Sequence, residues 1–175
     1  TADRLSYRED EDLVDAVGNV RIHQNDDVIT GPRLHLKITD SIGFFEQPKY
    51  SIKRQIKDAA PGQTTTGSGA AQRIDFEGEN RYKLTDATYS TCGPVDPDWF
   101  ARAKTMELDY DKDNGEAHDV TLVFKGMPIL YSPWLSFPLN NRRKSGFLLP
   151  TLGSTSKSGF EVLEPYYWNI APNMD

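Results

Sequence analysis

The sequence has 175 residues and a formal net charge of −6, with an isoelectric point of about 5.1. This charge argues against a nucleic-acid-binding protein, because binding to phosphates requires a concentrated basic face. The length allows one domain and an appendage. A mean hydropathy of −0.61 is ordinary for sheet layers that have one wet face. No run approaches the roughly 18 apolar residues of a membrane-spanning helix, so we expect no such helix here.

Alternation of apolar and polar residues predicts β-strands through the first two thirds of the chain. Leu5 and Tyr7 lie two residues apart and indicate a short edge strand. Apolar residues recur at every second position in residues 14–22 and again in residues 34–38. A period of two residues is typical of a half-buried strand. The same pattern continues in residues 42–45, 50–52, 74–76, 82–84, 106–110 and 120–124.

Two intervening segments predict loops. Residues 57–71 contain no apolar side chain larger than alanine and can bury little. We therefore expect a mobile hairpin tip or insertion there. Residues 111–115 end in Asn114-Gly115, a pair that favours tight hairpin turns.

A repeat of 72 residues links two of the predicted hairpins. The residues of the first copy are Leu34, Leu36, Ile38, Gly43, Tyr50 and Ile52, and those of the second are Met106, Leu108, Tyr110, Gly115, Leu122 and Phe124. Each copy reads as strand, turn, strand with one apolar face. Repeated hairpins of this kind predict two sheets whose inner faces meet.

The chain changes character near Gly126. Residues 126–175 are aromatic, rich in proline and short of charge except at Arg142, Arg143 and Lys144. We interpret residues 1–126 as a water-soluble β domain and residues 127–175 as the junction with, and the first strands of, a membrane β-barrel.

Three motifs in the second part resemble the LptD family of lipopolysaccharide-assembly proteins. They are residues 131–135 (Tyr-Ser-Pro-Trp-Leu), residues 143–150 (Arg-Lys-Ser-Gly-Phe-Leu-Leu-Pro) and residues 165–175, which begin Pro-Tyr-Tyr-Trp-Asn. Residues 14–22 resemble the opening strand of the OstA-type periplasmic domain that this family shares with LptA. The resemblance implies an all-β fold: an open two-sheet β-jelly roll, or β-taco, followed by the first strands of an outer-membrane β-barrel.

The resemblance also implies a function. The jelly roll would lie in the periplasm and receive the acyl chains of lipopolysaccharide from an LptA bridge, which would pair with an edge strand by β-augmentation. It would deliver the lipid to a barrel in the outer membrane that contains LptE. This activity is non-enzymatic and needs no cofactor. Residues 5–22 are the candidate edge for LptA, and the acidic residues 9–12 have the alternative interpretation of a solvated loop.

The alternating apolar residues are the candidate lining of the lipid groove. They are Val20, Ile22, Leu34, Leu36, Ile38, Phe76, Met106, Leu108, Tyr110, Val120, Leu122 and Phe124. Alternation alone also fits a closed sandwich whose core these side chains fill. The resemblance favours an open groove.

The family pattern implies roles for three further residues. Pro150 and Pro165 would weaken the barrel seam and form a lateral gate, because proline cannot donate a ladder hydrogen bond. Their alternative interpretation is that each proline ends a strand. Cys92 would form a disulfide with a cysteine outside this sequence, and otherwise it is a free thiol.

Catalytic and metal-binding patterns are not found in the sequence. His23, His35 and His118 lack metal-ligand spacing. Glu161 and Glu164 could be proposed as a glycosidase pair, but they fall in a predicted barrel strand. A periplasmic carbohydrate-binding or carbohydrate-active β-sandwich is the alternative function.

Overall fold

The computed structural model describes residues 1–24, 26–55, 64–93 and 96–139, and the backbone of residues 146–147, 151–155, 159–163 and 166–167. All regular elements in these ranges are β-strands. None of the described residues forms a helix long and apolar enough to cross a membrane. The expectation of an all-β fold is therefore confirmed.

Fifteen strands follow one another in the described part of the chain. They are β1 (Arg4–Arg8), β2 (Leu13–Gln24), β3 (Asp27–Lys37), β4 (Ile42–Glu46), β5 (Lys49–Gln55), β6 (Thr64–Ala70), β7 (Arg73–Glu77), β8 (Arg81–Tyr89), β9 (Trp99–Asp109), β10 (Asn114–Phe124), β11 (Met127–Phe137), β12 (Gly146–Phe147), β13 (Thr151–Thr155), β14 (Gly159–Leu163) and β15 (Tyr166–Tyr167).

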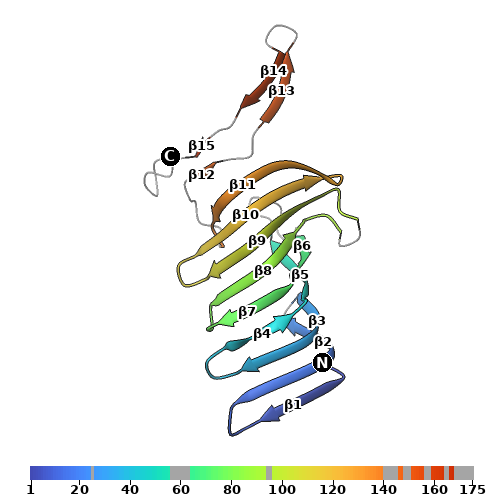
Figure 1. The fold of residues 1–175 in the computed structure, drawn as a ribbon, viewed down its shortest axis with the longest axis vertical. Helices are drawn as coiled ribbons and strands as arrows, with labels where there is room; N and C mark the ends of the chain where they lie inside the picture. The colour runs from blue at the N-terminus through green and yellow to red at the C-terminus, as the bar shows by residue number, and fades with distance from the viewer. Residues whose placement is uncertain are drawn as a thin grey trace.

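The first eleven strands form one antiparallel sheet (Figure 1). Its order is β1-β2-β3-β4-β7-β8-β9-β10-β11, while β5 pairs with β3 and β6. An isolated bridge between Ser68 and Ser90 joins β6 to the end of β8. Two further pairs, β12 with β15 and β13 with β14, form separate two-stranded ladders.

The long strands are interrupted near their middle, along one line across the sheet. Each pair of neighbouring strands has an unpaired position at this line. When the pairing on either side is extended across these positions, eight residues lie side by side, and we call this row the fold line. It consists of Asn19, Pro32, Gln47, Gln72, Asp86, Lys104, Asp119 and Pro133. Four of its members, Asn19, Gln47, Asp86 and Asp119, have φ between 42° and 51°. This is the left-handed region, where a strand cannot continue straight.

The sheet folds over at this line into two arms. In β8, Leu84 and Ala87 are both buried although they lie three residues apart. Side chains three apart on a regular strand point to opposite faces. The extra residue at Asp86 therefore keeps both side chains inside the fold, and β10 does the same around Asp119, where Ala117 is buried and Val120 half-buried.

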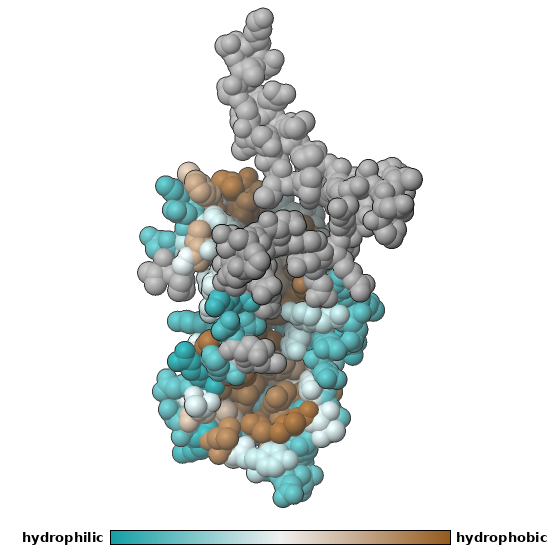
Figure 2. Space-filling model, turned by 180° about the vertical axis from the view of Figure 1, so that it is seen from behind, coloured by the Kyte–Doolittle hydropathy of each residue, from teal (hydrophilic) through white to brown (hydrophobic). Residues whose placement is uncertain are grey.

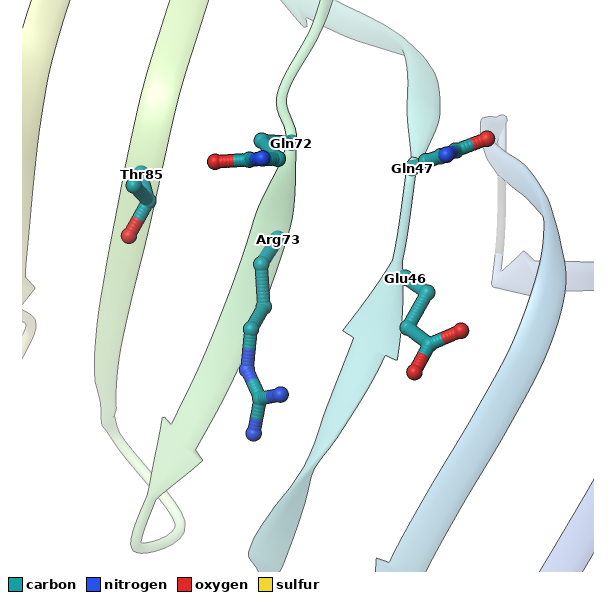
Figure 3. Close-up of a pocket in the computed structure, with 5 residues that line it drawn as sticks. All are labelled: Glu46, Gln47, Gln72, Arg73 and Thr85. Atoms are coloured by element: carbon teal, nitrogen blue, oxygen red, sulfur yellow. The ribbon is translucent and has the colours of Figure 1, made fainter.

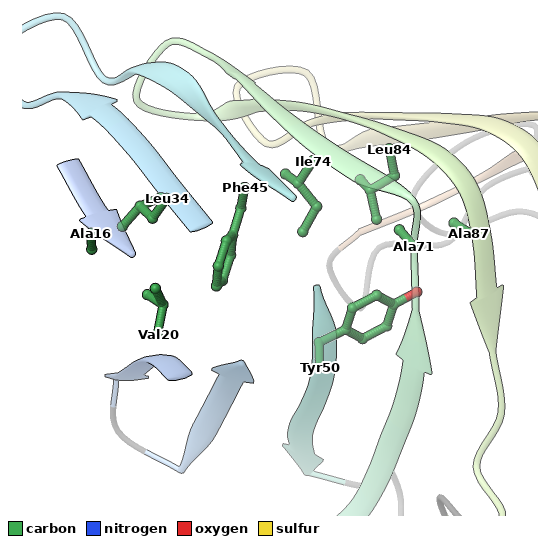
Figure 4. Packing of buried hydrophobic residues seen from close by; sticks show 9 residues of the cluster. All are labelled: Ala16, Val20, Leu34, Phe45, Tyr50, Ala71, Ile74, Leu84 and Ala87. Atoms are coloured by element: carbon green, nitrogen blue, oxygen red, sulfur yellow. The ribbon is translucent and has the colours of Figure 1, made fainter. Parts of the chain in front are cut away.

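The hydrophobic core fills the apex of this fold. Its buried members are Ala16, Val20, Leu34, Phe45, Tyr50, Ala71, Ile74, Leu84 and Ala87, each within three residues of the fold line. Figure 4 shows Phe45 and Ile74 pointing from one layer of strands toward Tyr50 on the other. The Phe45 side chain is fully buried.

The predicted repeat of 72 residues is present in the register. Lys37 pairs with Ile42 in one hairpin, and Asp109 pairs with Asn114 in the other. The left-handed turn residue Ser41 likewise recurs as Asp113. Each copy therefore forms the same hairpin across the same fold line.

Asn114-Gly115 does not form the turn that the sequence predicts. The turn precedes it, and Gly115 lies inside β10, opposite Leu108. A Cβ atom at Gly115 would lie 2.4 Å from the ring of Phe137 on β11. This glycine therefore serves close packing rather than chain reversal.

The prediction of a loop over residues 57–71 is wrong for its second half. Residues 64–70 form β6, which pairs with β5 throughout, and residues 56–63 lie outside the described part. A Cβ atom at Gly69 would lie 1.9 Å from the Thr88 carbonyl oxygen and 2.8 Å from the Tyr50 ring. The Tyr50 ring of the neighbouring strand β5 thus covers β6, and β6 needs no large side chain of its own.

β11 extends the large sheet beyond residue 126. It pairs with β10 from Met127 to Phe137, so the change of composition at Gly126 falls between two strands of one sheet. The division into residues 1–126 and 127–175 as periplasmic and barrel parts stays a prediction.

Replacing Tyr50 by Phe should reveal a pH-dependent contribution to stability. The Tyr50 hydroxyl donates a hydrogen bond to the Thr88 carbonyl oxygen, and burial raises the pKa of Tyr50 to about 12. A raised pKa means that this contribution is complete below pH 10 and is lost as pH rises toward 12. We expect Tyr50→Phe to cost about 1 kcal/mol near pH 8, and the cost to shrink between pH 10 and 12. Urea denaturation over that range checks this, and a pH-independent difference would contradict it.

Candidate functional site

The candidate site is the inner face of the fold, meaning the side chains that point between the two arms. Val20 and Leu34 of the predicted lining are buried in the core. Ile22, Leu36, Phe76, Met106 and Leu108 are half-buried and pack against that core. Their placement agrees with the predicted alternation, and their role in lining a lipid groove stays a prediction.

The remaining five predicted residues lie farther from the apex. Leu122 pairs with Ala101 on the same face as the buried Ala103. Val120 and Leu122 are half-buried, and Phe124 at the end of β10 is exposed. Tyr110 and Ile38 lie in turns just beyond β9 and β3 and are also exposed.

Exposure of the inner face rises steadily from the fold line to the ends of the strands. Along β9, Ala103 is 2% exposed, Met106 and Leu108 are half-buried, and Tyr110 is 38% exposed. Along β3, exposure rises from 7% at Leu34 to 50% at Ile38. A closed sandwich would cover both ends of these rows. The arms therefore meet at the apex and diverge toward the rim, and Figure 2 shows hydrophobic side chains in a hollow between hydrophilic margins.

The predicted lining omits three side chains that form the floor of this hollow. Ile29, Phe45 and Ile74 share the inner face with the predicted residues. In β3, however, the inner positions are Ile29 on one side of Pro32 and Leu34 on the other, so their parity changes. In the sequence, such a change of parity can be detected as two apolar residues that are separated by an odd number of positions, with a proline or an aspartate between them.

One rim of the inner face carries a row of three aromatic rings. Phe76 and Tyr82 lie edge to face with centroids 5.8 Å apart, and Tyr82 and Tyr110 do the same at 5.8 Å. The Tyr82 hydroxyl donates to the Glu79 carbonyl oxygen at 3.0 Å, and partial burial raises the pKa of Tyr82. These contacts order a rigid apolar ledge where the inner face meets solvent.

The outer face is polar and charged. His35 contacts Asp15 at 2.7 Å, between its Nδ1 and the carboxylate Oδ1, and this hydrogen bond holds the pKa of Asp15 below its usual value. Lys83 pairs with Glu107 at 3.1 Å. Apolar side chains therefore face inward and charged ones outward along the same strands, as alternation predicts.

A second hollow lies on the fold line and is lined by polar residues (Figure 3). Its volume is about 380 Å³, and its lining residues are Glu46, Gln47, Gln72, Arg73 and Thr85. The Arg73 guanidinium is already engaged, by Asp75 at 2.6 Å and by the ring of Phe44 at 4.1 Å. This hollow suits water rather than an acyl chain.

Cys92 is half-buried in a short loop tied to two strands. Its N–H donates to Ser90 Oγ at 3.0 Å, and Ser68 Oγ donates to its carbonyl oxygen at 3.2 Å. The thiol is free within the described residues, and the predicted disulfide involves a cysteine outside this sequence. Pro150 and Pro165 lie outside the described residues, as does Glu164. The residues that the structure describes contain no group of three metal-ligating side chains.

The gradient of exposure predicts that apex and rim differ in their contribution to stability. Phe45→Ala should destabilise the fold by about 3–5 kcal/mol, because it leaves a cavity in a fully buried site. Phe124→Ala should cost less than about 1 kcal/mol, because 43% of that side chain is already exposed. Urea denaturation of both variants tests this, and equal losses would indicate a sealed core.

Comparison with known proteins identifies the family. Residues 1–114 match the family described as "LptA/(LptD N-terminal domain) LPS transport protein". The whole chain is 47% identical to an LPS-assembly protein LptD of Azoarcus sp. (strain BH72) and 47% identical to one of Aromatoleum aromaticum. It is 42% identical over 99% of its length to one of Thiobacillus denitrificans. The chain spans about a fifth of each relative, 22% in all three. By both matches, this chain belongs to the LptD family of lipopolysaccharide-assembly proteins.

Proposed function

We propose that the inner face holds the acyl chains of lipopolysaccharide while the lipid crosses the periplasm toward an outer-membrane barrel. The observation that supports this most is the rising exposure of apolar side chains from Ala103 and Leu34 at the apex to Tyr110 and Ile38 at the rim. Such an arrangement leaves apolar surface available between two layers that are joined only at one side. In this proposal the chain transports the lipid and catalyses no reaction.

The energetics favour this occupant. Each methylene group withdrawn from water contributes about 0.8 kcal/mol, so a lipid with several acyl chains cannot cross an aqueous compartment unaided. The half-buried Leu36, Met106 and Leu108 offer partly covered apolar surface to such chains. The charged outer residues Lys83 and Glu107 keep the opposite face compatible with water.

The edge strand β1 is the proposed joint with an LptA-type partner. It pairs with β2 from Arg4 to Arg8, and among the described residues no strand occupies its other edge. An unpaired edge accepts a further strand by β-augmentation. The inner faces of partner and sheet would then form one continuous track.

The remainder of the proposal concerns parts of the protein beyond the described sheet. Residues 127–175 lead into a barrel that contains LptE, and the large sheet lies on its periplasmic side. Ser68 and Ser90 hold the backbone of Cys92. Its thiol pairs with a cysteine of the barrel region and fixes the sheet beneath the barrel mouth. The alternative is a carbohydrate-binding β-sandwich that uses Phe76, Tyr82 and Tyr110 as a stacking platform.

A photocrosslinking amino acid on the inner face tests the acyl-chain proposal. In cells, p-benzoylphenylalanine replacing Leu36 or Leu108 of the full-length protein should give adducts with lipopolysaccharide, because both side chains face the gap between the arms. Glu107 is the matched control, since it neighbours Leu108 in the chain and points outward to Lys83. Adducts at 107 equal to those at 108 would contradict the proposal. Binding of soluble sugars without lipid adducts would favour the alternative.

The proposed gate predicts an effect of the two prolines. Replacing Pro150 and Pro165 together by alanine restores two backbone donors. Each new ladder hydrogen bond stabilises a seam by about 0.5–1.5 kcal/mol. We expect slower delivery of lipopolysaccharide to the cell surface, measured by pulse labelling. Unchanged delivery in the double variant would exclude the gate role.

A further inference from the structure

The edge strand β11 differs from every other strand of the sheet in having an uncharged, apolar and exposed surface. From Met127 to Leu139 the sequence contains no charged residue. Six large apolar side chains of β11 are between 45% and 64% exposed: Met127, Ile129, Leu130, Tyr131, Trp134 and Leu135. The opposite edge, β1, carries Arg4 and Arg8 among its five residues. The two ends of the sheet are therefore built for different surroundings.

Both faces of β11 are apolar. Leu130 pairs with Leu122, and Leu135 pairs with the buried Ala117, so these two side chains continue the inner face. Trp134 pairs with His118 and Tyr131 with Thr121, so these two continue the outer face. On β10 the outer residues that pair with them, His118 and Thr121, are polar. A strand with two exposed apolar faces indicates contact with something other than bulk water.

The prolines of β11 argue against another β-strand as the covering partner. Among the described residues only β10 pairs with β11, but β11 contains Pro128 and Pro133. The ladder with β10 runs on both sides of Pro133, where His118 pairs with Trp134 and Val120 with Ser132. Pro133 itself lies on the fold line, where this ladder skips one pairing, so its missing N–H costs no ladder hydrogen bond with β10. Prolines on an edge strand discourage the addition of a further strand, and β11 has two of them in eleven residues.

The aromatic side chains on the outer face have the chemistry of a membrane interface. Tyr131 is 59% exposed, yet its hydroxyl donates to Asp119 Oδ1 at 2.7 Å. The apolar ring of Tyr131 is therefore exposed, while its polar hydroxyl group is hydrogen-bonded. Tyrosine and tryptophan concentrate at the depth of the lipid headgroups, where one end is apolar and the other is wet. The unpaired backbone groups of an edge strand exclude the hydrocarbon interior, where water cannot satisfy them.

We propose that the outer face of β11 lies in the headgroup region of a phospholipid leaflet, anchored by Tyr131 and Trp134. This inference rests on the proposed function, because it requires a membrane next to the sheet. It places the inner-face residues Leu130 and Leu135 at the same level as the lipid. Acyl chains that leave the inner face at β11 therefore meet an apolar phase without crossing water.

Photocrosslinking in the full-length protein in cells tests this contact. p-Benzoylphenylalanine replacing Trp134, and separately Tyr131, should yield adducts that mass spectrometry identifies as phospholipid. Each replacement exchanges one aromatic side chain for another at an exposed site. Two positions are used so that the test still holds if one variant fails to fold. Lys83 and Glu107 are matched controls on the polar outer face, where we expect no phospholipid adduct.

The outcomes separate this inference from the proposed function. Phospholipid adducts at 131 and 134 but not at 83 and 107 support it. Adducts at 131 and 134 with protein alone or with lipopolysaccharide alone, or no adduct at either position, overturn it. A lipopolysaccharide adduct at 108 in the same experiment sustains the proposed function whichever result the β11 positions give.

Discussion

The structure depends on how an antiparallel sheet bends without losing its hydrogen bonds. Each long strand crosses the fold line, and there the ladder loses one pairing and resumes in the next residue or two. Left-handed residues such as Asp86 and Asp119 take up the bend, at a local cost of order 1–3 kcal/mol each. Because the strands are bent at one level, a single sheet supplies both layers. The long strands therefore connect the two layers covalently along the fold line, and the opposite rim has no such connection.

This arrangement divides the apolar residues into two groups with different roles. The first group, exemplified by Phe45 and Ala87, lies at the apex and is fully buried, so it supplies the packing that stabilises the fold. The second group, exemplified by Phe124 and Tyr110, lies at the rim and remains exposed. Rim residues contribute little to folding, yet they are as apolar as the core. A protein selected for stability alone would replace them by polar residues or close the gap, which is why their exposure supports a lipid-binding role.

Period-two alternation was enough to predict the strands of the large sheet other than β6 and β11, and much of the inner face of each arm. Leu36 and Leu108 were assigned to that face from spacing alone, and both pack against the core. The bend was not predictable in the same way, because alternation assumes a continuous strand. Ile29 was missed for this reason, because the inner positions of β3 change parity across Pro32. The 72-residue repeat contained the missing information, since the left-handed Gln47 recurs as Asp119.

A second failure of sequence reasoning has a different physical origin. Residues 64–70 contain threonine, serine, glycine and alanine, a composition that predicts a loop when each side chain is considered alone. In the structure this strand is covered by Tyr50 and Tyr89, whose rings lie where the Cβ atoms of Gly69 and Gly67 would be. The apolar surface is thus provided by partners distant in sequence. Propensity cannot detect such compensation, because the small residue and the large one belong to different strands.

The two edges of the sheet give the fold a direction. β1 is short and charged at Arg4 and Arg8, which suits a strand that meets water and a soluble partner. β11 is longer, uncharged and contains Pro128 and Pro133, so strand addition is less favourable at β11 than at β1. An inner face that runs continuously from one edge to the other therefore has two different ends, although every strand between them is built alike. Under the proposed function, lipid would enter at β1 and leave at β11, and this difference between the two edges would permit one-way handover if the driving force acts on the partner at the β1 end.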